Sequence, residues 1–268
     1  MFEPFRKIFS SKPARKSASV PDGERAYVIG DVHGCLDLLD ALVRAIEEDD
    51  KAAAKADTTV IFLGDLIDRG PQSAGVIKLA RLWQEYRTIR FLLGNHEEMF
   101  LDSFKDTDIL RHFLKHGGRE TILSYGVSNQ DFNKASTKEL QAMMKDLVPK
   151  NDRKFLKGFE DMVEMGDYMF VHAGINPKKA MEEQKARELR WIREPFLNHK
   201  EHHSHIVVHG HTITEDIEEK KNRIGIDTGA YRHGVLTALV LEGDTRRYIQ
   251  AVTKKKGGIK IVKRDEAS

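Results

Sequence analysis

The sequence of 268 residues predicts a layered α/β fold in which some of the strands are parallel. Two patterns support this prediction. Short apolar runs recur along the chain, and most of them run into a glycine followed by a polar side chain of the kind that binds metals. After each of the first two runs, apolar residues recur at helical spacing. This strand–helix–strand–helix–strand order is typical of sheets whose parallel strands are buried on both faces.

Six apolar runs are predicted to be strands, and each one ends at a polar group. They are residues 26–30 before Asp31, 60–64 before Asp65, 89–94 before Asn95, 168–171 before His172, 206–208 before His209, and 224–226 before Asp227. Ligands of α/β proteins gather at the carboxyl ends of the strands. We therefore expect these polar groups to lie close together at one edge of the sheets.

Helices are predicted between the first three strands, and their apolar stripes are formed by Leu39, Leu42, Val43 and Ile46, and by Val76, Ile77, Ala80 and Trp83. Residues 97–163 have a helical composition and predict a helical excursion between strands, which either caps the site or flanks the sheet. The segments 234–241 and 248–252 predict a closing hairpin around residues 242–244.

The composition is that of a globular chain, with 40% hydrophobic and 32% charged residues. No apolar run approaches the roughly 18 residues of a membrane-spanning helix. The single cysteine, Cys35, excludes an internal disulfide framework and a cysteine-rich metal site. The first 20 residues lack the continuous apolar core of a secretory signal, so we expect a cytoplasmic protein.

Charge is distributed unevenly around a net value of +2. Residues 1–20 and 254–266 each carry +4, and the rest of the chain carries −6. An acidic body argues against a nucleic-acid partner. We expect a basic flexible segment at 1–22, a single domain at 23–253 and a basic tail at 254–268.

The polar groups near the strand ends form a candidate metal-ligand set: Asp31, His33, Asp65, Asn95, His172 and His211. Carboxylate, amide and imidazole ligands together suit manganese, iron or zinc, and the lack of thiolates argues against a purely structural zinc site. One Asp-x-His pair is common by chance. A series of glycine-flanked strand ends with polar groups is much less common by chance, and it favours a shared chemical role for these groups.

Five ordered motifs carry a family resemblance: GDVHG from Gly30, GDLIDRG from Gly64, GNHE from Gly94, HAG from His172 and GHT from Gly210. They resemble the motifs of the calcineurin-like metallophosphoesterases, and more narrowly the phosphoprotein phosphatase branch with its small bacterial and phage members. The motifs span residues 30–230. The resemblance implies a two-sheet β-sandwich flanked by helices in four layers, with a two-metal site at its edge.

The resemblance also implies a role for each ligand. Asp31, His33 and Asp65 would hold one divalent ion, and Asp65 would bridge to a second ion. That second ion would be completed by Asn95, His172 and His211. Manganese is the expected metal, with iron or zinc as alternatives, and the pair of ions would activate a water molecule for in-line attack on phosphorus.

The remaining catalytic roles come from the same resemblance. His96 would be the general acid that protonates the leaving oxygen, and Asp68 would orient it. Arg69 would bind the phosphoryl oxygens, together with Arg193 and with Asn95. His209 precedes the glycine of the late motif, so we expect it to be a strand residue that supports the site at most.

These motifs favour a metal-dependent phosphomonoesterase of the serine/threonine protein phosphatase type, acting on a phosphorylated protein or a small phosphate. The alternative is a dinucleoside-polyphosphate hydrolase such as a diadenosine tetraphosphatase. Asp68 separates the two, because the hydrolase branch typically lacks a carboxylate there. The Gly-His-Thr sequence of the last motif disfavours a phosphodiesterase. The complete set of candidate ligands disfavours a non-catalytic binding protein.

Overall fold

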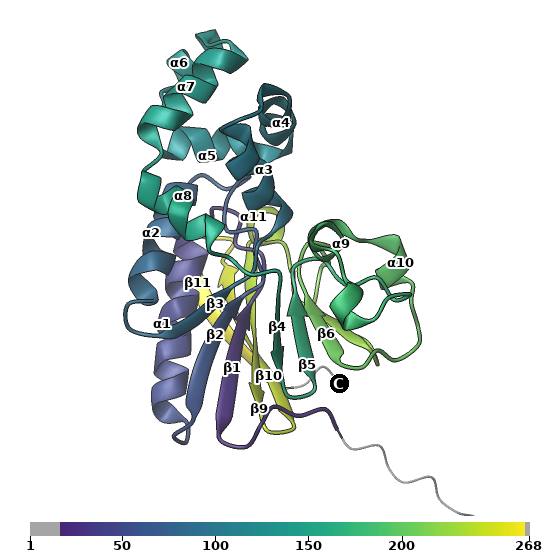
Figure 1. Ribbon diagram of the computed structural model, residues 1–268. Helices are drawn as coiled ribbons and strands as arrows, with labels where there is room; N and C mark the ends of the chain where they lie inside the picture. Colours follow the sequence, from purple (N-terminus) through teal and green to yellow (C-terminus); the bar gives the residue numbers. More distant parts are fainter. Residues whose placement is uncertain (1–16, 266–268) are drawn as a thin grey trace, which may run out of the picture.

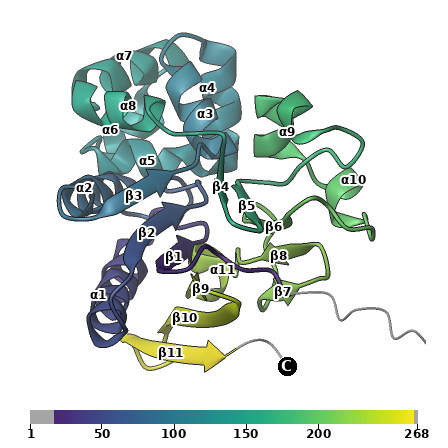
Figure 2. The same ribbon diagram turned by 60° about the horizontal axis from the view of Figure 1, so that its bottom comes forward.

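Two mixed β-sheets pack against each other at the centre of the protein (Figures 1 and 2). The structure is a computed structural model that describes residues 17–265. The first sheet has the order β11 (Ile259–Asp265), β10 (Thr245–Thr253), β9 (Val235–Glu242), β1 (Glu24–Ile29), β2 (Asp57–Phe62) and β3 (Thr88–Phe91). The second has the order β4 (Met162–Met165), β5 (Tyr168–Val171), β6 (Ile206–His209), β8 (Arg223–Gly225) and β7 (Glu218–Glu219).

Parallel pairing occurs where the sequence predicts it. Strand β1 pairs with β2, and β2 with β3, in parallel, whereas β9 joins the other side of β1 antiparallel. The predicted closing hairpin is formed by β9 and β10, which pair along most of their length. In the second sheet β5, β6 and β8 are parallel neighbours. The residues that follow the parallel strands therefore lie together at the carboxyl ends of these strands.

Side chains alternate between the two faces of each sheet, as the pleat of a strand requires. In β5, Tyr168 and Phe170 pack into the core between the sheets. Met169 and Val171 point the other way and belong to the core beneath the outer helices. Such a strand, apolar on both faces, is buried on both sides.

Helices cover the outer faces of both sheets and complete a four-layer arrangement. Helices α1 (Leu36–Ala52) and α2 (Ser73–Trp83) pack on the first sheet through the predicted stripes, in which Val43 is half-buried and the other seven residues are buried. Helices α9 (Ala186–Trp191) and α10 (Glu194–Leu197) pack on the second sheet. The predicted fold class, an α/β sandwich flanked by helices, is confirmed.

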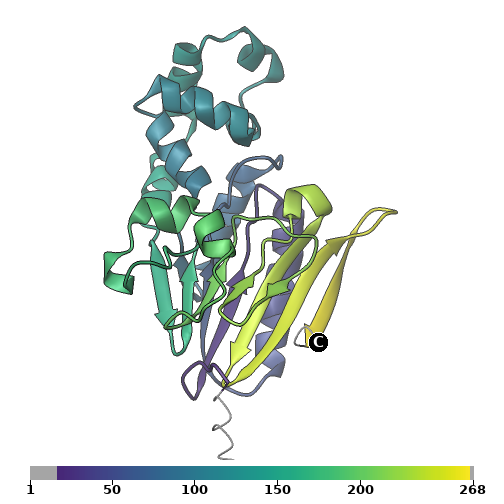
Figure 3. The same cartoon turned by 90° about the vertical axis from the view of Figure 1, so that its right-hand side faces the viewer.

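The predicted excursion at 97–163 is helical and rises above the sheets as a separate lobe (Figures 1 and 3). Its elements are α3 (Asn95–Ser103), α4 (Thr107–Phe113), the π-helical turn η1 (Leu114–Gly118), α5 (Arg119–Ser124), α6 (Asn129–Lys134), α7 (Thr137–Leu147) and α8 (Lys150–Lys157). Helices α5 and α8 contact α2, so the lobe flanks the first sheet as well as standing over the strand ends. Between residues 17 and 265, none of the helices has the length and apolarity needed to cross a membrane.

The prediction of a tail at 254–268 is wrong for the described residues of this segment, which end at residue 265. Residues Ile259–Asp265 form β11, which pairs antiparallel with β10 at the edge of the first sheet. Lys263 also donates a hydrogen bond to Asp49 on α1. The high lysine content conceals a strand whose outward side chains are solvated. At the other end, residues 1–16 of the expected N-terminal segment lie outside the described residues, and the Val20 amide donates to the Gly243 carbonyl.

Asp49 ties α1 to the last two strands of the first sheet. Its carboxylate accepts hydrogen bonds from Tyr27 and Lys263 at 2.7 and 2.8 Å and pairs with Arg247 at 2.6 Å. Burial by itself would raise the pKa of Asp49, but these partners outweigh it and lower the pKa to about 2. A folded-state pKa below the usual 3.8 means that the ionised carboxylate stabilises the fold above about pH 4, and that this contribution is lost as the pH falls towards 2.

We therefore expect Asp49→Asn to lower the free energy of unfolding by about 2 kcal/mol at pH 7, measured by urea denaturation. The gap between variant and wild type should shrink as the pH falls from about 4 to 2. Asp22→Asn, at an exposed turn, is the control and should change little. A gap that does not vary with pH would contradict the role of ionised Asp49.

Candidate active site

The structure brings all six predicted metal ligands together at the carboxyl ends of the strands. Asp31 and His33 follow β1, Asp65 follows β2, and Asn95 opens α3 after β3. His172 follows β5 and His211 follows β6. All six side chains are buried, although each is polar. Buried polar groups need compensating partners, so their concentration at one point indicates a binding site.

The loops that carry these residues have an unusual backbone. Among the described residues, the only non-glycine residues with positive φ are His33, Asp65, Asp68, Arg69 and His211, with φ between 45° and 74°. All five belong to the predicted site. A left-handed conformation costs about 1–3 kcal/mol for a residue with a side chain and persists where the surroundings impose it. The strain is therefore concentrated where the candidate ligands converge.

Two groups of side chains have the spacing of metal ligands. His33, Asp65 and His96 form one triplet, and Asp65, His172 and His211 form the other, each with one ligand atom per residue within 4.8 Å of the others. Asp65 belongs to both triplets. Its Oδ2 lies 3.6 Å from His33 Nε2 and 3.4 Å from His172 Nε2. A carboxylate shared in this way suits two neighbouring cations, because it offsets their mutual repulsion.

Asp31 and Asn95 lie beside these triplets. The Asp31 carboxylate accepts a hydrogen bond from the His211 backbone amide at 3.0 Å, and Asn95 Oδ1 lies 3.0 Å from His172 Nε2. The first triplet thus contains His96 where the sequence analysis expects Asp31. A Cβ atom at Gly210 would overlap Asp31 Oδ1, so only glycine lets this loop approach the carboxylate.

The pKa shifts of two of these groups indicate a buried environment in which positive charge would be stabilising. Burial raises the pKa of Asp31 well above its usual value, and the neighbouring Asp227 and Asp65 add to the effect. Burial lowers the pKa of His211 to about 2, so its ring is neutral. His211 Nε2 is buried and has no hydrogen-bond partner among the described residues. Clustered carboxylates and a neutral imidazole with an unused nitrogen fit divalent metal ions.

Two of the histidines are oriented by backbone carbonyls. His33 Nδ1 donates to the Ile67 carbonyl and His172 Nδ1 donates to the Leu63 carbonyl, both at 2.8 Å. These bonds fix the tautomer and turn each Nε2 towards Asp65. Both carbonyls belong to the segment around Asp65, so one loop provides the shared carboxylate and also orients two rings.

Glu97 organises this loop and has no role in the prediction from sequence. Its buried carboxylate accepts hydrogen bonds from the amides of Asp65 and Leu66 at 2.8 Å and of Gly94 at 3.1 Å. Burial, with the nearby Asp65, raises its pKa to about 7. The signal that could have found it is its position as the third residue of α3, where a glutamate commonly closes a capping box.

His96 and Asp68 form the predicted pair. His96 Nδ1 donates to Asp68 Oδ2 at 2.6 Å, and His96 Nε2 points towards Asp65 Oδ2 at 3.9 Å. Burial lowers the pKa of His96, but the carboxylates of Asp65 and Asp68 outweigh burial and raise it. A protonated imidazole is therefore favoured beside the shared carboxylate, as a general acid requires.

Thr121 connects the helical lobe to this pair. Its hydroxyl donates to Asp68 Oδ1 at 2.6 Å and accepts from the Asp68 amide at 2.9 Å, and it lies 2.9 Å from the Ser73 hydroxyl. Thr121 is on α5, 53 positions after Asp68. The Ser73 hydroxyl on α2 accepts from the Asp68 amide at 3.0 Å, so α2 and α5 both hold Asp68, and Thr121 alone bonds to the carboxylate that orients His96.

We expect Thr121→Val to lower kcat about tenfold, because a hydrogen bond to a charged group contributes about 1.5–3 kcal/mol. Thr121→Ser keeps the hydroxyl and should retain most of the activity. Thr137→Val, at the half-buried start of α7, is the control. Equal activity of Thr121→Val and wild type in a steady-state assay would show that the lobe does not support His96.

The two predicted arginines lie on opposite sides of the ligands. Arg69 donates to His33 Nε2 at 2.8 Å, and its guanidinium lies 4.8 Å from the centre of the Tyr231 ring. Arg193 donates to the Thr212 hydroxyl at 3.2 Å and to the His211 carbonyl at 3.4 Å. Tyr231 was not predicted, and its contact with Arg69 could not be foreseen, since the two belong to different parts of the chain.

His209 lies outside both triplets. Its buried ring packs edge-on against Phe196, 5.1 Å between centres, and its Nε2 accepts from Arg223 at 3.2 Å. Arg190 is held by Glu98 and Asp161, which leaves Arg193 as the arginine beside His211. Between residues 17 and 265, no third group of histidines, cysteines and carboxylates has metal-ligand spacing, and His202, His203 and His205 belong to neither triplet.

Comparison with known families matches residues 24–233 to the calcineurin-like phosphoesterases. The chain belongs to this family. The match covers all the candidate metal ligands, the second sheet, and strands β1, β2 and β3 of the first sheet. The two-sheet fold described above is the fold of this family.

The chain is similar to tetraphosphatases and to a protein phosphatase. The chain is 30% identical over 156 residues to an asymmetrical bis(5'-nucleosyl)-tetraphosphatase of Bacillus velezensis, covering 55% of each protein, or about half the length of that relative. It is 26% identical to the same enzyme of Oceanobacillus iheyensis over 235 residues, 79% of this chain and 86% of that protein. Serine/threonine-protein phosphatase 1 of Salmonella typhimurium is 38% identical over 77 residues, 29% of this chain and 32% of that protein.

Solved structures show the same fold. A cold-active protein tyrosine phosphatase superposes with a TM-score of 0.57 at 17% identity, covering 91% of this chain and 81% of that protein. Identity at this level shows the fold alone.

Proposed function

We propose that this phosphoesterase hydrolyses dinucleoside polyphosphates such as diadenosine tetraphosphate, with two divalent metal ions and an activated water. The alignment that spans 86% of a bis(5'-nucleosyl)-tetraphosphatase is the observation that carries this proposal. The alignment with the Salmonella typhimurium protein phosphatase spans 29% of the chain. The proposal therefore replaces the protein phosphatase expected from the motifs with the alternative considered beside it.

The residues of the site suit this reaction. Asp65, with His33 on one side and His172 and His211 on the other, would hold two ions of manganese, iron or zinc, with Asp31 and Asn95 beside them. Bound divalent ions lower the pKa of water and supply a hydroxide near neutral pH. Arg69 and Arg193 would bind non-bridging phosphoryl oxygens, since a guanidinium donates two parallel hydrogen bonds.

His96 would transfer a proton from Nε2 to the leaving oxygen, while Asp68 holds Nδ1. The polyphosphate leaving group of a dinucleotide is a weak base and needs little protonation. A serine or threonine side chain is a strong base when it leaves and needs full protonation.

A serine/threonine protein phosphatase is the second candidate, because the Asp68–His96 pair suits a leaving group that needs protonation. The typical lack of a carboxylate in the hydrolase branch made Asp68 the discriminating feature in the sequence. A residue that orients an acid does not itself contact the substrate, however, so Asp68 excludes neither class.

A direct comparison of substrates tests the proposal. The protein, stripped with chelator and reloaded with Mn²⁺, is assayed on diadenosine tetraphosphate and on phosphoserine and phosphothreonine peptides. We expect kcat/KM for the dinucleotide to exceed that for every peptide at least tenfold. Chromatography distinguishes AMP and ATP from two molecules of ADP as products. A tenfold preference for a phosphopeptide would establish the second candidate instead.

A further inference from the structure

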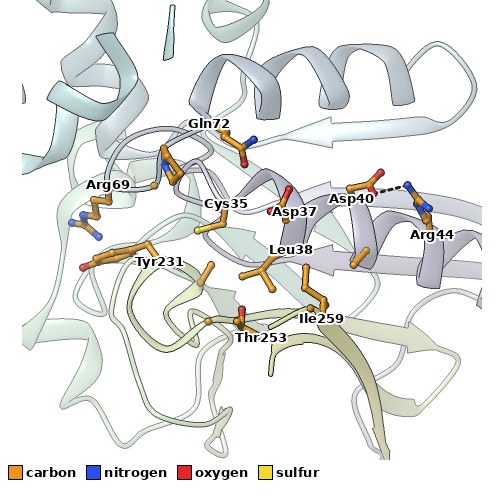
Figure 4. Close-up of a pocket in the computed structure, with 16 residues that line it drawn as sticks. Cys35, Asp37, Leu38, Asp40, Arg44, Arg69, Gln72, Tyr231, Thr253 and Ile259 are labelled. Carbon is orange, nitrogen blue, oxygen red and sulfur yellow. Dashed lines mark hydrogen bonds and ion pairs between the residues drawn. The ribbon is translucent and has the colours of Figure 1, made fainter. Parts of the chain in front are cut away.

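A cavity of about 800 Å³ opens beside Arg69 and Tyr231 (Figure 4). It lies between the first turns of α1, the segment after Arg69, α11 (Ala230–His233) and the β10–β11 hairpin. Arg69 lines the cavity and also donates to His33 Nε2 in the first ligand triplet. A molecule whose phosphate contacts Arg69 would therefore place its next group at the mouth of this cavity.

The walls of the cavity suit a flat, uncharged group. Leu38 and Ala41 on α1 and Ile259 on β11 line the cavity. The Tyr231 ring lies at the end next to Arg69 (Figure 4). Tyr231 is 38% exposed, so part of this large apolar ring is accessible. Apolar walls with an aromatic ring are typical of pockets for small organic molecules, and bases stack on such rings.

Polar groups lie at the rim of the same cavity. Asp37 is exposed and has no hydrogen-bond partner among the described residues, and Gln72 offers an amide close by. Arg44 is paired with Asp40 at 2.7 Å, so Arg69 is the one lining cation without a carboxylate partner in the described part of the chain. This charge balance disfavours a second phosphate deep in the cavity. It favours a neutral group whose N–H or O–H donors can form hydrogen bonds to the Asp37 carboxylate and the Gln72 amide oxygen.

We propose that this cavity is a nucleoside subsite, which binds the base and ribose attached to the phosphate held by Arg69. The inference rests on the proposed function, because it identifies where the nucleoside of a dinucleoside polyphosphate binds. The base lies against Leu38 and Ile259, and its amino group faces Asp37 or Gln72. A terminal phosphate without a nucleoside gains nothing from these contacts.

Filling the cavity tests the subsite. Ala41→Trp places a large side chain in it, and Ala52→Trp is the matched control, on the exposed end of the same helix and outside the cavity. In Ala41→Trp we expect the ratio of kcat/KM for diadenosine tetraphosphate to kcat/KM for p-nitrophenyl phosphate to fall at least tenfold. The ratio should stay within twofold of wild type in Ala52→Trp. Ile259→Trp fills the cavity from the opposite wall and replaces Ala41→Trp if circular dichroism shows that the latter misfolds.

Inhibition provides a second readout that does not need turnover of the dinucleotide. AMP and ribose 5-phosphate are compared as competitive inhibitors of p-nitrophenyl phosphate hydrolysis. In wild type we expect the inhibition constant of AMP to be at least tenfold lower than that of ribose 5-phosphate, and this preference should disappear in Ala41→Trp.

The outcomes separate the two proposals. Turnover of diadenosine tetraphosphate with equal inhibition by both compounds, or an unchanged substrate ratio in both filling variants, would overturn the subsite alone. A clear preference for AMP without turnover of the dinucleotide would reject the proposed function and keep the subsite. Impaired hydrolysis of a phosphopeptide with unaltered hydrolysis of the dinucleotide would assign the cavity to a peptide side chain and overturn the subsite.

Discussion

Asp65→Asn is expected to abolish turnover while the protein stays folded. Asp65 is the residue that the two ligand triplets share, and its Oδ2 lies within 4 Å of nitrogen atoms of His33, His96 and His172. Burial acts to raise the pKa of Asp65, but these three histidines outweigh it and hold the pKa well below its usual range. An ionised carboxylate at this position can attract both cations, whereas a neutral amide of the same shape cannot.

We expect kcat/KM of Asp65→Asn to fall by about three orders of magnitude or more, because stabilisation of transition-state charge by metal ions amounts to several kcal/mol. Metal content after gel filtration, measured by mass spectrometry, should fall from two ions per chain towards none. Circular dichroism checks the fold, and Asp146→Asn on the exposed face of α7 is the control. Two bound ions in Asp65→Asn would show that the carboxylate does not bridge them.

His96→Ala is expected to have an effect that depends on the leaving group. If His96 is the general acid, kcat for a phosphoserine peptide should fall by about two to four orders of magnitude. The loss should be much smaller for p-nitrophenyl phosphate, whose leaving group needs little protonation. Asp68→Asn should follow the same order of substrates with a milder effect, since it only disturbs the orientation of the ring.

The same variant also tests a second role. His96 Nε2 has ligand spacing to His33 and Asp65, so it could bind a metal ion instead of protonating a leaving group. A ligand role predicts equal losses on both substrates and a lower metal content. A general-acid role predicts unequal losses and two retained ions. His202→Ala, at an exposed position, is the control for the loss of an imidazole.

The architecture was accessible from the sequence because buried parallel strands have a simple signature. Runs such as residues 60–63 are apolar at every position, and the polar residue that follows each run must emerge at the carboxyl edge of the sheet. That reasoning placed Asp31, Asp65 and His172 at one edge, and the structure brings them together there.

Supporting contacts were not accessible, because they depend on how distant segments pack. Thr121 lies on a short helix of the lobe, and nothing in its sequence neighbourhood indicates that it contacts Asp68. Tyr231, in α11, contacts Arg69, in the loop after β2, although the two are far apart in the sequence. Glu97 is different, since its spacing from Gly94 is a local signal, although its bonds to the Asp65 loop are tertiary. The periodicity of apolar residues predicts single helices and strands, but not which side chains of different elements contact each other.

The basic residues of the last strand have a consequence for how the protein behaves in concentrated solution. Strand β11 is the outermost strand of the first sheet in the described chain, so one row of its backbone amides and carbonyls is left without a strand partner. Such a row can recruit a strand from another molecule and start aggregation. Lys260 stands exposed along it without an ion-pair partner among the described residues, whereas Lys263 pairs with Asp49 and Arg264 with Asp216. Two copies meeting edge to edge would bring their Lys260 charges together. We therefore expect Lys260 to oppose intermolecular pairing along the open edge.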